Sequence, residues 1–126
     1  MILVDTSVWI DHLRFGKGAL EALLNNDLVG IHPFVTGEIA CGSMKHRTLV
    51  LGLLDSLPAF PLASDDEVRE LIERRALFNR GIGWVDAHLL ASMLLLPHST
   101  LLTKDKNLAK IADELIESRS TGSHIH

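Results

Sequence analysis

Ile2-Leu3-Val4-Asp5 stands near the start of the chain as a continuous apolar run that ends at an acid. Such a run is typical of a short strand buried on both faces of a parallel sheet. Asp5 would then lie at the carboxyl end of the strand, where open α/β sheets bind their ligands. These few residues therefore predict a fold class and the place of a functional site.

The remaining sequence alternates strand patterns with helix patterns. Strands are predicted at 28–31 and 100–103, and a possible edge strand at 59–62, where Pro61 bars a central position. Helices are predicted after Thr6, at 19–24, after Pro33, and at 48–57, 65–79, 84–96 and 107–117. The buried stripe of the 65–79 helix should be Val68, Leu71, Ile72 and Ala76. This alternation indicates an α/β domain with a central, mostly parallel sheet flanked by helices.

Length and composition agree with one domain. The chain has 126 residues, and 47% hydrophobic against 22% charged residues excludes an intrinsically disordered protein. Residues 119–126 lack an apolar period and read as a tag or disordered tail, so we expect the domain to occupy residues 1–118. A single cysteine, no export signal and no membrane-length apolar segment predict a cytoplasmic protein without membrane association.

Charge limits the possible partners. The formal net charge of -4 argues against a protein that binds nucleic acid through bulk positive charge. A role on nucleic acid would need local basic patches or a bound cation.

Four acids can reach the same edge of the predicted sheet. Asp5 and Asp105 follow apolar strands directly, Asp86 starts a helix after a two-glycine loop, and Glu38 lies on the helix after the second strand. Taken singly, each fits a turn former, a helix cap or a solvated surface residue. Together their carboxylates would repel, and a hard divalent cation would relieve that repulsion. Oxygen ligands suit Mg²⁺ or Mn²⁺, whereas no cysteine cluster or His-x-x-x-His supports zinc.

Three spaced motifs together with Glu38 resemble those of PIN domains, in particular the VapC toxins of bacterial toxin–antitoxin modules. They are V-D-T-S-V-W-I from Val4, G-I-G-W-V-D-A-H-L-L-A-S from Gly81 and L-L-T-K-D-K-N-L from Leu101. The resemblance runs from Met1 to about Glu117. It implies a Mg²⁺- or Mn²⁺-dependent endoribonuclease inhibited by a VapB-type antitoxin encoded beside it.

The resemblance also implies roles for individual residues. Asp5, Glu38, Asp86 and Asp105 match the acidic set, and Thr103, with Thr6 and Ser7, matches hydroxyl positions that orient an acid or a water. A cation bound mainly by Asp5 and Asp86 would activate water for in-line attack, leaving 5′-phosphate and 3′-hydroxyl ends. Candidate RNA phosphate contacts are Lys104, Arg80, Arg14 and Lys17.

Apolar helices indicate protein partners. The Leu-rich helix at 48–57 and the early helices would form a groove for an amphipathic segment of the antitoxin. Exposed apolar helices in so small a chain also predict a homodimer.

Other interpretations of the same residues remain open. A phosphotransfer enzyme of the haloacid-dehalogenase type needs a second Asp two positions after the first, where this chain has Ser7. A non-catalytic receiver-like module using Asp5 and Lys104 needs an acidic pair that is missing beside the first strand. A metal-free ribonuclease would use histidines such as His12 and His88. Trp9 and Trp84 either stack on an RNA base or, more commonly for tryptophan, pack in the core.

Overall fold

The computed structural model describes residues 1–16 and 18–125, and of 120–125 only the backbone. Within these residues it contains three short strands and seven helices. The strands are β1 (Ile2–Val4), β2 (Val29–Gly30) and β3 (Thr100–Leu102). The helices are α1 (Thr6–Phe15), α2 (Ala19–Asn25), α3 (Pro33–Ala40), α4 (Arg47–Ser56), α5 (Asp65–Arg74), α6 (Trp84–Leu95) and α7 (Lys106–Ile125).

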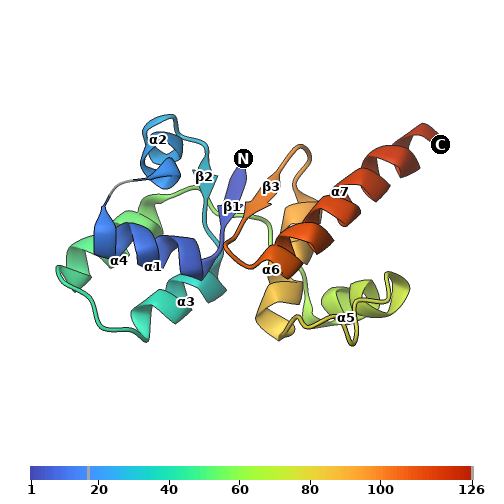
Figure 1. The fold of residues 1–126 in the computed structure, drawn as a ribbon, viewed down its shortest axis with the longest axis horizontal. Coiled ribbons are helices and arrows are strands. Elements are labelled where there is room, and N and C mark those ends of the chain that lie inside the picture. Colours follow the sequence, from blue (N-terminus) through green and yellow to red (C-terminus); the bar gives the residue numbers. More distant parts are fainter. Residues whose placement is uncertain (17, 126) are drawn as a thin grey trace.

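The strands form one parallel sheet in the order β2-β1-β3. Leu3 pairs with Gly30 on one side and with Leu101 on the other, so β1 is central and its Leu3 and Val4 are fully buried. Helices α1–α4 gather on one side of the strands and α5–α7 on the other (Figure 1). The α/β fold with a parallel sheet and flanking helices, predicted from the Ile2–Val4 run, is therefore confirmed.

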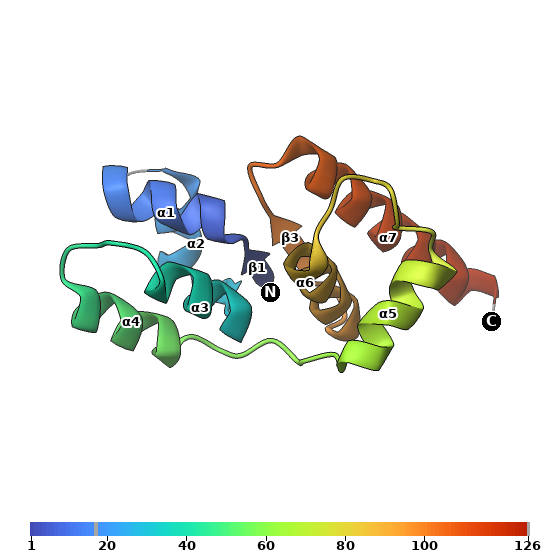
Figure 2. The same cartoon turned by 90° about the horizontal axis from the view of Figure 1, so that it is seen from below.

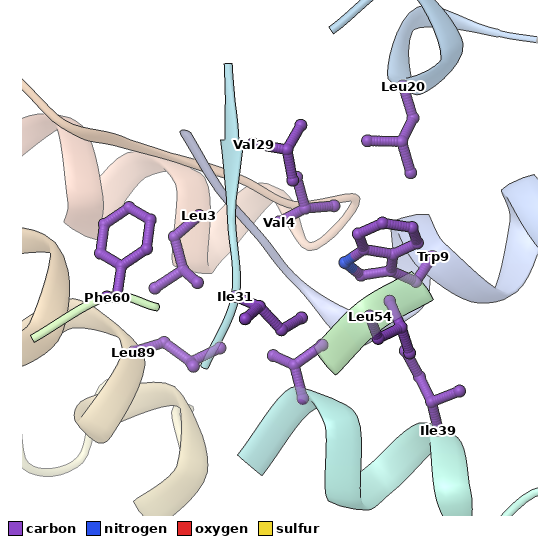
Figure 3. Close-up of a cluster of buried hydrophobic side chains, with 11 residues drawn as sticks. Leu3, Val4, Trp9, Leu20, Val29, Ile31, Ile39, Leu54, Phe60 and Leu89 are labelled. Carbon is purple, nitrogen blue, oxygen red and sulfur yellow. The ribbon is translucent and has the colours of Figure 1, made fainter. Parts of the chain in front are cut away.

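Two clusters of buried side chains hold the two groups of helices to the sheet. The first joins β1 and β2 to α1, α3 and α4, and includes Leu3, Val4, Trp9, Ile39 and Leu54 (Figure 3). The second lies among α5, α6 and α7, which Figure 2 shows together, and includes Val68, Leu71, Leu90, Leu108 and Ile111. Each fully buried aliphatic side chain contributes about 1.5–3 kcal/mol to the free energy of folding.

The predicted edge strand at 59–62 is wrong. Ala59 makes only an isolated parallel bridge to Ile31, and the segment from Pro61 onward is not a strand. The contact is nevertheless tight, because a Cβ on Gly30 would lie 2.5 Å from the Phe60 ring. A glycine in β2 therefore lets the Phe60 ring pack directly against the strand.

The predicted end of the fifth helix at Asn79 is also wrong. Helix α5 ends at Arg74, and Ala76 follows in the left-handed conformation with φ 51°. The Leu77 N–H donates to the Ile72 carbonyl at 2.9 Å and the Ala76 N–H to the Glu73 carbonyl at 3.3 Å. This is a Schellman ending without its usual glycine. Ala76 is consequently exposed, and Leu77 is buried in its place.

The last helix is longer than predicted. Helix α7 continues past the expected end at Glu117 to Ile125, so residues 119–125 have helical backbone. That residues 119–126 are a tag or tail stays a prediction, and Lys17 and His126 lie outside the described residues. In the part of the chain described, no helix combines the length and the hydropathy needed to cross a bilayer.

Candidate active site

Asp5 stands at the carboxyl end of β1 and caps the helix that follows. Its Oδ1 accepts the Thr6 N–H at 2.8 Å, which fixes the start of α1. Its Oδ2 accepts the hydroxyl of Thr103 at 2.8 Å and that of Ser7 at 3.4 Å. Three donors therefore orient a half-buried carboxylate toward the edge of the sheet.

Asp105 is joined to Asp5 through Thr103. The Thr103 hydroxyl donates to Asp5 and accepts the Asp105 N–H at 3.1 Å. The Asp105 Oδ1 in turn accepts the N–H groups of Asn107 at 2.9 Å and Leu108 at 3.1 Å. Since β1 and β3 are paired neighbours, their carboxyl ends bring these acids together from opposite ends of the sequence.

Glu38 reaches the same edge from α3. The Thr6 hydroxyl donates to its Oε1 at 2.7 Å, so Thr6 binds one acid with its N–H group and another with its hydroxyl. The Glu38 side chain is otherwise exposed. The hydroxyls of Thr6, Ser7 and Thr103, singled out in the sequence, thus each contact an acid.

Asp86 is the half-buried acid of α6. Its Oδ2 accepts the Gly83 N–H at 3.2 Å. Burial raises the pKa of the Asp86 carboxyl and the Gly83 hydrogen bond opposes this, while the charges of Asp5, Asp105 and Glu38 raise it further. The other three predicted acids therefore lie close enough for their charges to act on Asp86.

The donor set of this site fits a hard divalent cation. It consists of carboxylate and hydroxyl oxygens, the ligands that Mg²⁺ and Mn²⁺ prefer, and the repulsion at Asp86 is what such a cation would relieve. Among the described residues, no three His, Cys, Asp or Glu side chains already stand in coordinating positions. Hydroxyl and backbone N–H donors hydrogen-bond to these acids and fix their orientations.

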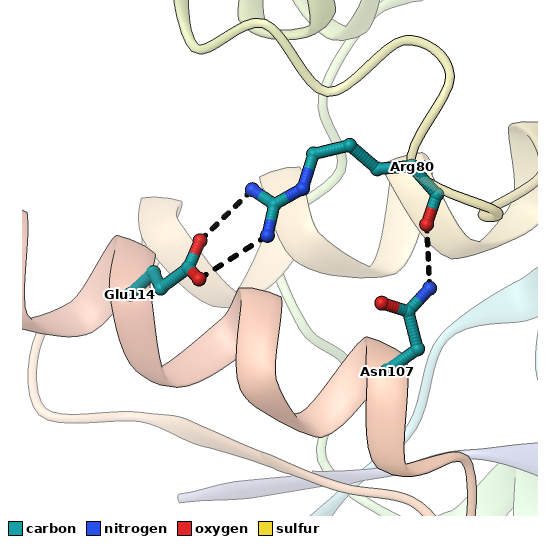
Figure 4. A network of polar contacts seen from close by, with 3 residues as sticks. All are labelled: Arg80, Asn107 and Glu114. Carbon is teal, nitrogen blue, oxygen red and sulfur yellow. Dashed lines mark hydrogen bonds and ion pairs between the residues drawn. The ribbon is translucent and has the colours of Figure 1, made fainter.

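Two of the predicted RNA contacts are engaged within the protein. Arg80 forms a bidentate pair with Glu114, at 2.8 and 3.1 Å, and its carbonyl accepts the Asn107 side-chain amide at 2.6 Å (Figure 4). These contacts tie the loop before α6 to α7, and thereby the segment of Asp86 to that of Asp105. Lys104 pairs with Asp11 of α1. The Glu114 pair weakens the case for Arg80 as an RNA contact.

A cavity of about 600 Å³ opens beside Glu38, among α1, α3 and α4. Its lining combines apolar side chains with basic ones: Ile10, Leu13, Ile39, Met44, Leu49 and Val50 with Arg14, Lys45 and His46. We call this the α1–α4 cavity. It coincides with the groove predicted from the Leu-rich helix.

His12 and His88, the candidate histidines for metal-free chemistry, lie in different surroundings. His12 packs against Trp9, with ring centroids 6.2 Å apart, whereas His88 is buried in α6 against Phe34. Across residues 1–16 and 18–125, no hydrogen bond or ring contact joins His12 to His88.

Sequence reasoning missed the partners of several charged groups. Asp11, Asn107 and Glu114 were not singled out, although they bind Lys104 and Arg80. Asn107 and Glu114 lie about two turns apart on α7 and so share one face of the helix. This spacing was the sequence signal that the two residues could bind the same partner.

The chain belongs to the PIN domain family, whose profile matches residues 2–114. It is similar to "Ribonuclease VapC32" of Mycobacterium tuberculosis (strain CDC 1551 / Oshkosh), with 52% identity over 108 residues, which is 86% of this chain and 87% of the relative. The protein of the same name from strain ATCC 25618 / H37Rv matches with the same identity and coverage. No solved structure gives a significant match.

These comparisons confirm the resemblance inferred from the acidic motifs. The family assignment also removes the haloacid-dehalogenase and receiver interpretations, which had already lacked their second acids. PIN-domain ribonucleases generally depend on divalent metal ions.

Proposed function

We propose that this protein is an endoribonuclease toxin of a toxin–antitoxin module that hydrolyses RNA with Mg²⁺ or Mn²⁺. The observation that carries the proposal is the gathering of Asp5, Glu38 and Asp105 around Asp86 at the carboxyl edge of the sheet, where Thr6 and Thr103 link the first three acids by hydrogen bonds. The family and the similarity to a protein named as a ribonuclease support it. In this proposal the catalytic domain spans residues 1–118.

The acids divide the work according to their contacts. Asp5 and Asp86 would hold the cation, and Asp105 and Glu38 would complete the site directly or through water. When bound, the cation would neutralise the acids, bind the scissile phosphate and lower the pKa of the attacking water. Thr103 and Ser7 keep the Asp5 Oδ2 in place, and Thr6 keeps Glu38 turned toward the site.

Fixed positive charge has to bind the RNA beyond the site, since the chain is acidic as a whole. Lys104 is adjacent to Asp105, and its contact with Asp11 is largely exposed, so an incoming phosphate can replace that carboxylate. Arg14 lies on the α1–α4 cavity, which also reaches Glu38. These two side chains are the proposed phosphate contacts.

The α1–α4 cavity is the proposed binding site of a VapB-type antitoxin. Leu49 is 64% exposed and Leu53 60% exposed on α4, a surface suited to the apolar face of an amphipathic segment. A basic side chain of that segment would reach Glu38 at the cavity wall. We further propose a cytoplasmic location and a homodimer, the latter because exposed apolar side chains such as Phe15 are available for a second contact.

Cleavage of a mixed RNA substrate with Mn²⁺ tests the proposal. Asp5→Asn should lower the rate by about 100-fold or more, the scale seen when a charge-stabilising group leaves an active site. Asp113→Asn is the matched control, because Asp113 is an exposed acid on α7 outside the site. Full activity of Asp5→Asn at saturating Mn²⁺ would contradict the assignment.

The chemistry of the product ends separates water from the ribose 2′-hydroxyl as nucleophile. We expect 5′-phosphate and 3′-hydroxyl ends, continued cleavage at a single 2′-deoxy sugar, and no cleavage in EDTA. Cyclic-phosphate ends formed in EDTA would instead point to His12 and His88.

A further inference from the structure

Trp84 is a large aromatic side chain left open to solvent in the first turn of α6, the turn that also carries Asp86. It is the first residue of α6, two positions before Asp86, and its side chain is 43% exposed. Trp9, the other tryptophan, is only 4% exposed and belongs to the core of the α1–α4 side. Trp9 therefore packs in the core, and Trp84 requires another explanation.

The indole of Trp84 contacts the ring of His88. Its centroid lies 4.6 Å from that of His88, with the two rings at 82°. His88 is itself buried, with its ring 4.7 Å from the Phe34 ring and its Nε2 3.2 Å from the Asp65 carboxylate. The indole thus rests on a ring that is fixed by three elements, α3, α5 and α6.

The contact with His88 covers only part of the indole. Because the rings are nearly perpendicular, the imidazole meets either the edge of the indole or one of its faces. In both arrangements His88 leaves at least one indole face uncovered. An aromatic face that is held in place but not buried loses little conformational freedom when a second ring stacks on it.

We propose that Trp84 is a substrate-binding residue that stacks on a base of the RNA bound at the acidic site. The inference rests on the proposed ribonuclease function and adds a determinant of substrate choice. The acids and their cation recognise only phosphate, which is the same at every nucleotide. Single-stranded RNA is distinguished by its bases, which commonly stack on exposed aromatic side chains.

Binding of two labelled oligomers to the full chain tests the proposal. One is a short oligoadenylate and the other an abasic ribose-phosphate oligomer of equal length, both measured with Mn²⁺ on Asp5→Asn protein to prevent cleavage. Trp84→Leu and Trp84→Phe are added to this background. Leu95→Ala is the matched control, since Leu95 is 44% exposed at the other end of the same helix.

Trp84→Leu should weaken binding of the oligoadenylate by between about 5-fold and 100-fold, the range measured for loss of one base–aromatic stack. Trp84→Phe should restore most of the affinity, and Leu95→Ala should have no effect. The abasic oligomer should bind all four proteins equally. The oligoadenylate should also quench tryptophan emission in protein that retains Trp84, because Trp9 is shielded by its burial.

Three outcomes would overturn the proposal. Equal affinity of the Trp84→Leu and reference proteins for the oligoadenylate would show that no base stacks there. An equal loss on the abasic oligomer would show an effect on the fold or the phosphate site instead. Binding of neither oligomer, with no cleavage by the natural sequence, would overturn the ribonuclease function as well, whereas the first two outcomes leave that function intact.

Discussion

Helices α5 and α4, which lie on opposite sides of the sheet, begin in different ways. On the α5–α7 side, Ser64 and Glu67 form a complete capping box and Arg80 is locked to Glu114 by two hydrogen bonds. On the α1–α4 side, α4 starts at His46 in a left-handed conformation with no side-chain cap, and Leu49 and its neighbours surround a cavity of about 600 Å³. Side chains thus cap the start of α5, whereas α4 begins without a side-chain cap and carries the exposed Leu49 at the cavity proposed for the antitoxin.

The candidate site lies between these sides and takes two acids from each. Asp5 and Glu38 belong to α1 and α3, whereas Asp86 and Asp105 belong to the starts of α6 and α7. Both sides of the sheet thus contribute acids to one cluster of negative charge. An antitoxin bound to the α1–α4 cavity would touch Glu38 and leave the second core undisturbed.

The largest difference in stability between the two sides should come from replacing one leucine by alanine on each side. Leu108→Ala removes a fully buried side chain from the α5–α7 core and should lower the free energy of unfolding by about 2–5 kcal/mol. Leu49→Ala removes a side chain that is 64% exposed and should change it by less than about 0.5 kcal/mol. Urea unfolding measures both, and similar losses would contradict the comparison.

Divalent metal should stabilise the junction of the two sides. Mn²⁺ or Mg²⁺ at about 100 times its dissociation constant should raise the free energy of unfolding by up to about 2.7 kcal/mol. Asp86→Asn should reduce this gain, while Asp113→Asn should keep it. A melting temperature of the parent protein that is indifferent to millimolar metal would argue against the site.

The starts of α5 and α4 should respond in opposite directions. Ser64→Ala removes a capping side chain and should lower the free energy of unfolding by about 1 kcal/mol. His46→Gly relieves a left-handed residue with φ 54° and should raise it by up to about 1 kcal/mol. Thermal denaturation of the two variants would refute the contrast if both changes had the same sign.

A smaller effect should appear in the pH dependence of the metal-free protein. The pKa of Asp86 is raised in the folded state above its ordinary 3.8. Ionisation of this carboxyl therefore lowers the free energy of unfolding over the pH interval between 3.8 and the raised pKa. The stability of Asp86→Asn relative to the parent should therefore increase across the same interval in EDTA. His32, whose pKa is lowered to about 4 by burial and by His88, affects both proteins alike and cancels in the difference.

The parts of this protein that sequence could predict are those governed by local pattern. The Ile2–Val4 run, the acids after strands and the Ser64–Glu67 cap each depend on neighbours along the chain. The structure bears out the strand and the cap, and it places Asp5, Glu38 and Asp105 near enough for their charges to act on Asp86. The end of α5 escaped prediction because Ala76 occupies a position where glycine is the usual signal.

Contacts between distant segments were not predictable in the same way. The charged guanidinium of Arg80 favours a carboxylate partner. Which carboxylate it pairs with depends on the packing of α7 against the loop before α6, and this packing brings Glu114 to Arg80. The two tryptophans have similar apolar surroundings in sequence, yet one is buried and the other exposed. Their difference arises from tertiary position, which local pattern does not contain.

The hydrogen bond from Thr103 to Asp5 spans 98 positions of the sequence and has a consequence for protein synthesis. Because β1 is central and β3 is its last neighbour, a growing chain on the ribosome first exposes Asp5 without its orienting hydroxyl and without Asp105. Synthesis at roughly 5–20 residues per second separates the first acid from the last by several seconds. The proposed nuclease is therefore incomplete throughout most of its own translation, and a nascent chain has no finished active site until its last strand has emerged.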